Sequence, residues 1–345
     1  MGISDIFEDR AGGLWIATSG SGLLRLNPAS GSLTHYRHDP NNPNSLHKNG
    51  VSRIYEFSAD PGAIWLAIGA DGLDRLEVST GKFTHFLSER RVTALFEDHQ
   101  GTAWIGSDGL GVLDLETGTI KQFFSSPAAL RGDRIWGIYE DRNGLFWAGG
   151  TGWVAEFNRQ TERFNVQEIA KVDSSLPGYA GYRSFVEDAN GRLWTGSRGL
   201  SFFDASSNDF SAYDLRAHLI DHDNNISEFV VDQFGSIWVA TWGGLIKLEE
   251  RRSVSVFQHD PANTNTLNDN RIRAIWQDED GRIWIGHNNR FIDSVHPETL
   301  YFRFFGLSWI NRPYALSSYF VVLSSYFTSF LASKGAFGCF IGFVT

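Results

Sequence analysis

One short pattern, an Asp-x-x-Gly turn followed by an apolar strand containing tryptophan, recurs along most of this 345-residue chain. The tryptophan after each turn marks the length of each repeat, and successive tryptophans lie 39 to 50 residues apart. The seven copies are Trp15, Trp65, Trp104, Trp147, Trp194, Trp238 and Trp284. A period in the forties with four strand-like segments per copy is typical of β-propeller blades. The sequence therefore predicts an all-β fold, a seven-bladed β-propeller of four-stranded antiparallel blades.

The repeats divide the chain into two parts. Residues 1–304 form the expected propeller, with repeats at about 1–50, 51–90, 91–133, 134–181, 182–224, 225–270 and 271–304. Residues 305–345 form an atypical apolar tail that lacks the turn and the tryptophan strand. A frame-shifted or misjoined end is the leading interpretation of this tail. Disorder and a spanning or interfacial membrane helix are the alternatives, because residues 313–333 carry no charge.

The first strand of each copy carries apolar residues three apart, as in Val51 and Ile54 or Ile272 and Ile275. In a regular strand such residues point to opposite faces, so we expect a strand buried on both sides between neighbouring blades. The Asp and Gly residues are expected to make the turn, and the tryptophans to form the core. The recurring Glu-Asp pairs are interpreted as structural rather than as a glycosidase carboxylate pair, because neighbouring strand residues face opposite ways.

Two stretches carry a family resemblance: "ISDIFEDRAGGLWIATSGSGLLRLNPASGSLTHYRHDPNNPNSL", and "VSRIYEF" followed by "IWLAIGADGLDRLEVSTGKFTHF". They resemble the two-component regulator propeller repeat, which builds the extracytoplasmic sensor region of many bacterial hybrid histidine kinases and related transmembrane regulators. The resemblance covers residues 1–304. It implies a periplasmic or extracytoplasmic sensor, homodimeric in its full-length parent, with any kinase activity in an output domain that this chain lacks.

The composition limits which kinds of ligand or partner the chain is expected to bind. The net charge of −10 and the lack of clustered Lys and Arg argue against nucleic acid and anionic membranes, and favour neutral or cationic ligands. The single cysteine, Cys339, forms no internal disulfide. The N-terminus has no signal peptide and starts inside the first repeat, which suggests a fragment. Membrane contact is expected only through missing segments or the tail.

The expected ligand site is one mouth of the central channel, lined by the loops that lead into the first strands and those that join second to third strands. These loops are where the copies diverge. The candidate ligand-binding residues are Trp242, Arg198, Asp108, Asp71, Arg134, Arg183, Tyr182 and Asn288. An indole beside Arg and Asn donors suits stacking on a sugar ring, although Trp242 could instead pack on a neighbouring loop. Trp136 and Trp276 are expected either to narrow the channel or to fill it.

Metal and catalytic patterns are weak, and no cofactor or metal is predicted. His218, Asp221, His222 and Asp223 lie close together in a connector without a third remote ligand. A propeller lyase or glycosidase would need a channel-facing carboxylate or histidine found in one blade only, for which Asp71, Asp108 and His287 are the candidates.

Three functions therefore remain open. The first is a ligand-sensing input domain of a bacterial two-component or related receptor, recognising an oligosaccharide. The second is a protein-interaction or dimerisation scaffold, and the third is the propeller enzyme. Because the first repeat starts at its first strand and the seventh ends with its fourth, ring closure is expected to rest on side-chain packing alone.

Overall fold

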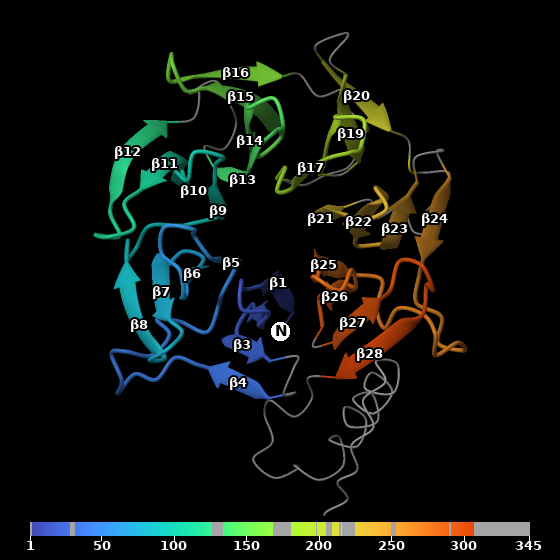
Figure 1. Cartoon of the computed structure of the whole chain (residues 1–345), viewed down its shortest axis with the longest axis horizontal. Helices are drawn as coiled ribbons and strands as arrows, with labels where there is room; N and C mark the ends of the chain where they lie inside the picture. The colour runs from blue at the N-terminus through green and yellow to red at the C-terminus, as the bar shows by residue number, and fades with distance from the viewer. Residues whose placement is uncertain are drawn as a thin grey trace, which may run out of the picture.

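The computed structural model describes residues 2–27, 32–125, 134–167, 181–197, 199–204, 209–213, 215, 225–249, 253–289 and 291–306. Within these residues the regular structure is all β, in seven four-stranded sheets without a helix. In each sheet, strands that follow one another in the chain pair antiparallel, so every sheet is a simple meander. The sheets stand as blades around a ring, with the first strand of each blade innermost and the fourth at the rim (Figure 1). The predicted seven-bladed propeller is confirmed.

The blades are numbered in chain order, and each contains four consecutive strands. Blades 1 to 4 contain β1 (Ile3–Glu8), β2 (Leu14–Thr18), β3 (Leu23–Leu26), β4 (Leu33–Tyr36); β5 (Arg53–Tyr55), β6 (Ala63–Ala67), β7 (Leu73–Glu77), β8 (Lys82–Phe86); β9 (Ala94–Glu97), β10 (Ala103–Gly106), β11 (Gly109–Leu113), β12 (Ile120–Ser125); and β13 (Ile135–Glu140), β14 (Phe146–Gly150), β15 (Trp153–Asn158), β16 (Arg163–Gln167). Blades 5 to 7 contain β17 (Phe185–Glu187), β18 (Leu193–Gly196), β19 (Leu200–Asp204), β20 (Asp209–Tyr213); β21 (Ile226–Val231), β22 (Ile237–Thr241), β23 (Gly244–Leu248), β24 (Val254–Phe257); and β25 (Ile272–Gln277), β26 (Ile283–His287), β27 (Phe291–Val295), β28 (Phe302–Gly306).

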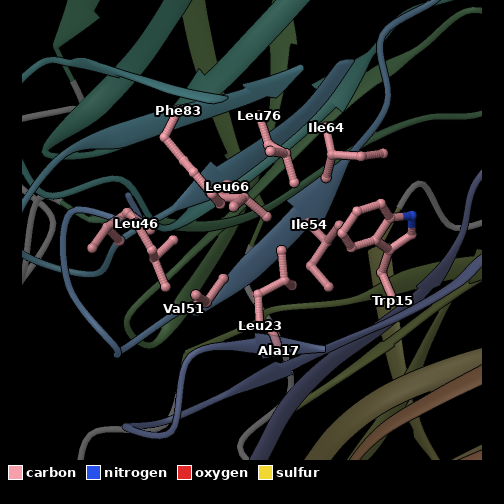
Figure 2. Close-up of a cluster of buried hydrophobic side chains, with 11 residues drawn as sticks. Trp15, Ala17, Leu23, Leu46, Val51, Ile54, Ile64, Leu66, Leu76 and Phe83 are labelled. Atoms are coloured by element: carbon pink, nitrogen blue, oxygen red, sulfur yellow. The ribbon is translucent and has the colours of Figure 1, made fainter. Parts of the chain in front are cut away.

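The hydrophobic core is divided among the seven joints, where a joint is the contact between neighbouring blades. The described part of the chain has seven buried clusters, one at each joint. Figure 2 shows the cluster between blades 1 and 2, where Trp15 of β2 packs against Ile54 and Ile64 of the next blade. Six of the seven repeat tryptophans are buried, and Trp284 is half-buried. Since no blade buries its tryptophan alone, the period of the sequence reflects packing between blades.

The aspartate that opens each hairpin turn also holds the tryptophan. In blade 1, Gly12 donates its backbone N–H to the carbonyl of Asp9 at 2.8 Å and has a φ of 74°, which favours glycine. The Asp9 carboxylate accepts from the backbone of Gly13 at 2.7 Å and from Trp15 Nε1 at 2.8 Å. The same aspartate-to-indole bond, at 2.8–3.0 Å, recurs in the other six blades from Asp60, Asp98, Asp141, Asp188, Asp232 and Asp278. The aspartate thus links the turn to the core, which satisfies the buried indole N–H.

The glutamate before the aspartate links neighbouring blades. Glu97 accepts from the backbone N–H of Ser58 in the preceding blade at 2.9 Å, and Glu140 accepts from that of His99 at 2.7 Å. Equivalent bonds join Arg10 to Glu56, Arg142 to Glu187, and Glu279 to Glu8. The two remaining joints have Val231 and Gln277 at this position. The Glu-Asp pairs are therefore structural, with each acid serving a different blade.

The ring closes between blades 7 and 1 without a shared strand, because β1 to β4 and β25 to β28 form separate sheets. Ile3 and Ile6 of β1 pack with Ala274 of β25, and Trp276 and Phe305 border the cluster. The bond from Glu279 to Glu8, 3.0 Å long, adds one polar contact to this closing joint. Closure therefore rests mainly on side-chain packing, as expected. Residues 307–345, which include nearly all of the expected tail, lie outside the described residues, and no described helix is long and apolar enough to cross a membrane.

Candidate functional site

Each inner strand, the first of its blade, directs one side chain into the central channel. This channel position follows the first apolar residue of the strand or of the segment leading into it. All seven channel positions line one cavity of about 640 Å³, and they are Ser4, Ser52, Thr93, Trp136, Arg183, Ser227 and Arg273. Loop residues such as Ser19, Asn225 and Trp242 complete its wall at the expected mouth. A cavity of this size fits a small ligand such as an oligosaccharide.

A β-bulge places the channel position. In blade 7, Ile272 pairs with His287 and Ala274 with Gly286, so Arg273 is an extra residue without a partner on β26. The same shift occurs at Ser4, Trp136 and Ser227 in blades 1, 4 and 6. A bulge turns its extra side chain away from the regular alternation of the strand. The inner strands thus point a side chain into the channel while neighbouring apolar residues such as Ile272 and Ala274 pack between the blades.

The bulge corrects the expectation that apolar residues three apart face opposite ways. Ile272 and Ile275 pair with His287 and Ile285, which are two residues apart on β26 and therefore share a face. Both isoleucines lie in one cluster, packed against Trp238 of the preceding blade. The prediction of opposite faces was wrong because it assumed an unbroken two-residue alternation. The inner strand is still buried on both sides, through other residues.

An arginine guanidinium group lies over each of two tryptophan rings in the cavity wall. Trp136 lies beneath Arg183, whose Cζ is 4.5 Å from the ring centroid, and donates from Nε1 to Thr151 Oγ1 at 2.9 Å. Arg273 Cζ lies 5.5 Å from the ring centroid of Trp242. Arg273 Nε also donates to Asn288 Oδ1 at 3.0 Å. These contacts orient both guanidinium groups at the cavity wall.

An ionic cluster crosses the channel at the wall of the cavity. Arg53 of blade 2 lies 3.6 Å from Asp5 of blade 1 and 3.6 Å from Glu228 of blade 6. Asp5 also accepts from the backbone of Ile54 at 2.8 Å, and Glu228 accepts from that of Ile275 at 3.0 Å. Burial raises the pKa of Asp5 to about 6 and that of Glu228 to about 8, although the positive charge of Arg53 opposes both shifts. Glu228 is thus largely protonated at neutral pH.

Arg183 and Arg273 have no carboxylate within ion-pair distance among the described residues. The Arg183 side chain is exposed and lines the cavity. Desolvation by the surrounding protein, with repulsion from Arg53 and Arg273, lowers the pKa of Arg183 to about 10. Burial also lowers the pKa of Arg273. Both groups remain charged at neutral pH in surroundings that disfavour charge.

The structure places two of the eight sequence-predicted residues, Trp242 and Arg183, in the cavity wall. Asn288 stands behind the wall as the acceptor for Arg273, and Tyr182 packs in the cluster between blades 4 and 5. Arg134 and Asp108 form an exposed pair at 3.7 Å that is not part of the cavity wall.

Asp71 is also exposed, and its backbone N–H closes a turn onto Ile68 at 2.9 Å. Arg198 lies outside the described residues. Whether Trp242 and Arg183 bind a ligand stays a prediction.

Other candidates have different positions from those expected. Trp276 was expected in the channel, but it packs at the closing joint, 5.2 Å from the Phe7 ring. Its place in the strand explains this, since Trp276 lies beyond the bulge and points between blades. His287 is fully buried and bonded to Asp293 at 2.8 Å. Neither His287 nor Asp71 nor Asp108 lines the cavity, so none is the channel-facing group that an enzyme there would need.

One described cluster has metal-ligand chemistry. Ligand atoms of His47, Asp74 and His85 lie within 4.8 Å of one another. His85 already bonds Asp74 at 2.7 Å and the carbonyl of Pro43 at 3.0 Å, and Asp74 accepts from the His47 backbone at 2.8 Å. In blade 7, Asp293 likewise accepts from the backbone of a connector residue, Asn268, although Phe304 stands in the place of His85. The cluster therefore anchors a connector, while His218, Asp221, His222 and Asp223 lie outside the described residues.

Sequence analysis missed most of the ring of channel positions, above all Arg273, and the Arg53 cluster. A signal was present, because the residue after the first apolar position varies from Ser to Trp to Arg while its neighbours stay apolar. That signal can be read only once the bulge is known. An unbroken strand would direct this side chain into a joint.

The family model described as the two-component regulator propeller matches residues 1–20, 87–109, 129–152 and 266–289. The matched segments together cover about a quarter of the chain and are similar to that repeat. The four matches lie in blades 1, 3, 4 and 7, and the structure shows the same architecture in blades 2, 5 and 6. No curated protein matches the chain significantly.

Solved structures from B. thetaiotaomicron are similar to this chain, and the first of them shares its fold. One is the extracellular domain of a "putative hybrid two component system", with 17% identity and a TM-score of 0.68. The match covers 83% of this chain and 37% of that domain, so the chain spans well under half of it. A second extracellular domain of a system so described has 21% identity and a TM-score of 0.42 over 88% of this chain and 58% of its own.

Proposed function

We propose that this propeller is the extracytoplasmic ligand-sensing domain of a two-component or related receptor, and that its ligand occupies the channel cavity. The observation that carries the proposal is the ring of channel positions, to which every blade contributes one side chain. A ligand there contacts all seven inner strands at once. The matches to the regulator repeat and the extracellular domain that shares the fold support a sensory role.

The cavity wall supports a saccharide as the ligand. Trp136 and Trp242 are both half-buried in the wall, and a guanidinium group lies over each ring. The C–H face of a sugar ring would stack on the indole surface that the guanidinium leaves open. Ser52, Thr93 and Ser227 donate their hydroxyl protons to the backbone carbonyls of Ala67, Gly106 and Ile272, so their oxygens are left to accept from the sugar's hydroxyls. A ligand held this way changes the relative stability of blade arrangements, and this difference is what a receptor transmits.

The first test is Trp242→Ala. A ligand that binds only the folded protein raises the thermal unfolding midpoint by mass action. We expect one or more oligosaccharides from a panel of plant, algal and host glycans to raise the midpoint of the wild-type protein. Trp242→Ala should remove that shift, because the sugar loses its stacking surface. Differential scanning fluorimetry measures the midpoint, and isothermal titration gives the affinity.

The matched control is Phe234→Ala in the same blade. Phe234 is 53% exposed in the turn between β21 and β22, at the opposite end of the blade from Trp242. It should leave any ligand shift unchanged. A cooperative transition that no glycan moves would contradict the sensor proposal and favour the scaffold alternative, for which homodimerisation is the corresponding prediction.

A further inference from the structure

The charge of the channel is opposite to that of the whole molecule. The chain carries a net charge of −10, yet Arg53, Arg91, Arg183 and Arg273 all line the cavity. The carboxylates that accompany them are Asp5 and Glu228, and Arg53 lies between these two. The charge of Arg53 is therefore matched within the cluster. Arg183 and Arg273 are left without a matching carboxylate among the described residues.

Of the cavity arginines, Arg91 lies in the segment that leads into β9, and Arg183 and Arg273 are the two at channel positions. Each guanidinium lies over an indole, Arg183 over Trp136 and Arg273 over Trp242. Stacking fixes the plane of the guanidinium and leaves its edge N–H groups free for a planar partner. Asn288 takes the Nε proton of Arg273 at 3.0 Å, so the terminal amino groups of that side chain remain for a ligand. A carboxylate or sulfate matches this fork of donors with two parallel hydrogen bonds.

The arrangement is costly in the unliganded protein. Repulsion among Arg53, Arg183 and Arg273 adds to the burial that lowers the pKa of Arg183. Arg183 is exposed to the channel and Arg273 is half-buried, so the cost is mainly repulsion between like charges. An anion in the cavity would relieve the repulsion.

We infer that the channel cavity binds an anionic ligand, most simply an acidic sugar, whose carboxylate or sulfate group is held by Arg183 and Arg273. This inference rests on the proposed function and specifies the class of its ligand. It also revises the expectation, drawn from net charge alone, that neutral or cationic ligands fit better.

The experiment compares galacturonic acid, galactose 6-sulfate and galactose at equal millimolar concentration and constant ionic strength. Both acidic sugars, or the one whose anion fits, should raise the unfolding midpoint, and galactose should not. Arg183→Gln combined with Arg273→Gln should weaken binding of the acidic sugar about tenfold or more, because two charge-assisted hydrogen bonds are lost. Arg163→Gln, at an exposed position on the outer strand β16, is the matched control and should change nothing.

A second measurement separates ligand binding from structure. Arg183→Gln should raise the midpoint of the unliganded protein, because it removes a repelled cation, whereas a purely structural arginine would lower the midpoint on removal. If the double variant does not fold, Arg273→Lys keeps the charge and should still weaken binding by losing the two-pronged contact.

Two outcomes would overturn the inference in different ways. Galactose or another neutral glycan that stabilises the wild type and both arginine variants equally, but not Trp242→Ala, would leave the sensor proposal standing without an anionic ligand. No shift with any acidic sugar, together with no shift from the neutral glycan panel, would contradict both.

Discussion

At the scale of single residues, the aspartate that opens each turn combines two tasks that the sequence shows separately. The Asp-x-x-Gly spacing predicts the turn, and the apolar run predicts a buried tryptophan. The bond between them, as from Trp238 Nε1 to Asp232 at 2.8 Å, depends on the hairpin bringing residues six apart together. The sequence therefore predicted that the aspartate lies in a turn and that the tryptophan is buried. The hydrogen bond between them could be identified only from the pairing of the two strands.

Asp232→Ala should destabilise the propeller by about 3 kcal/mol, because the buried indole N–H and two turn N–H groups lose their acceptor. Asp232→Asn should cost less, since its carbonyl oxygen still serves the turn while its amide opposes the indole. Asp71→Ala, in an exposed turn, is the control and should be close to neutral. Urea unfolding followed by tryptophan fluorescence measures all three. Equal losses for Asp232→Ala and Asp71→Ala would show that the indole bond contributes nothing.

At the scale of elements, the inner strand is where sequence and structure differ most. The four strands of each blade and their order follow from the repeat, because turn glycines and apolar runs recur in register. The bulge at Arg273 or Ser227 has no such mark, since a bulge depends on how two strands pair rather than on which residues they contain. Consequently the mouth of the channel was predicted, and Trp242 and Arg183 with it, while the ring of channel positions was not.

The inner strands of blades 1, 2 and 6 are also coupled by ionisation. The folded-state pKa values of Glu228, about 8, and Asp5, about 6, lie above the ordinary values of 4.5 and 3.8. A raised pKa stabilises the fold below the ordinary value, and this stability is lost as pH rises through the folded-state value. The wild-type propeller should therefore lose stability between about pH 4.5 and pH 8.

Glu228→Gln should flatten that dependence, because the amide keeps an acceptor for the Ile275 N–H and does not ionise. The groups facing Glu228 are Arg53 and Asp5, with Arg183 and Arg273 near Arg53. The variant should exceed the wild type in stability above pH 8 and fall to or below it near pH 5. Thermal unfolding midpoints of both proteins, measured by calorimetry between about pH 5 and pH 8, test this prediction. Parallel curves for the two proteins would mean that Glu228 does not titrate in this window.

At the scale of the whole molecule, the seven joints share one pattern of contacts between blades, but not every joint has all of these contacts. Five of the seven joints have the glutamate bond between blades, and the closing joint is one of these five. The closing joint also contains Trp284, which is half-buried, whereas the other six repeat tryptophans are buried. The net charge of −10 describes the outer surface and gives no indication of the channel, where arginines converge from blades 2, 3, 5 and 7. Whole-chain totals therefore predict solubility better than they predict a site.

The closing joint should open more readily than the joint between blades 1 and 2. Backbone amides that this opening exposes, in β1 and β25, should exchange hydrogen faster than those in β5. Glu8→Ala should increase that difference, because it removes the bond from Glu279. Glu97→Ala removes the equivalent bond between blades 2 and 3 and serves as the control. Hydrogen exchange followed by mass spectrometry resolves these peptides, and uniform exchange across the blades would contradict a weak closing joint.

The separate sheets at the closing joint also set an order in which the chain acquires its structure. Arg10 and Glu56 meet across 46 residues, whereas Glu279 and Glu8 meet across 271. Bringing together ends that are about six times farther apart costs roughly 1.5 kcal/mol more in chain entropy. Each blade is a local meander and its neighbour follows directly in the chain, so contacts can accumulate as an open arc of low contact order. The channel cavity, which needs all seven inner strands, exists only after the final contact, and a ligand held there would act late, on the closed ring alone.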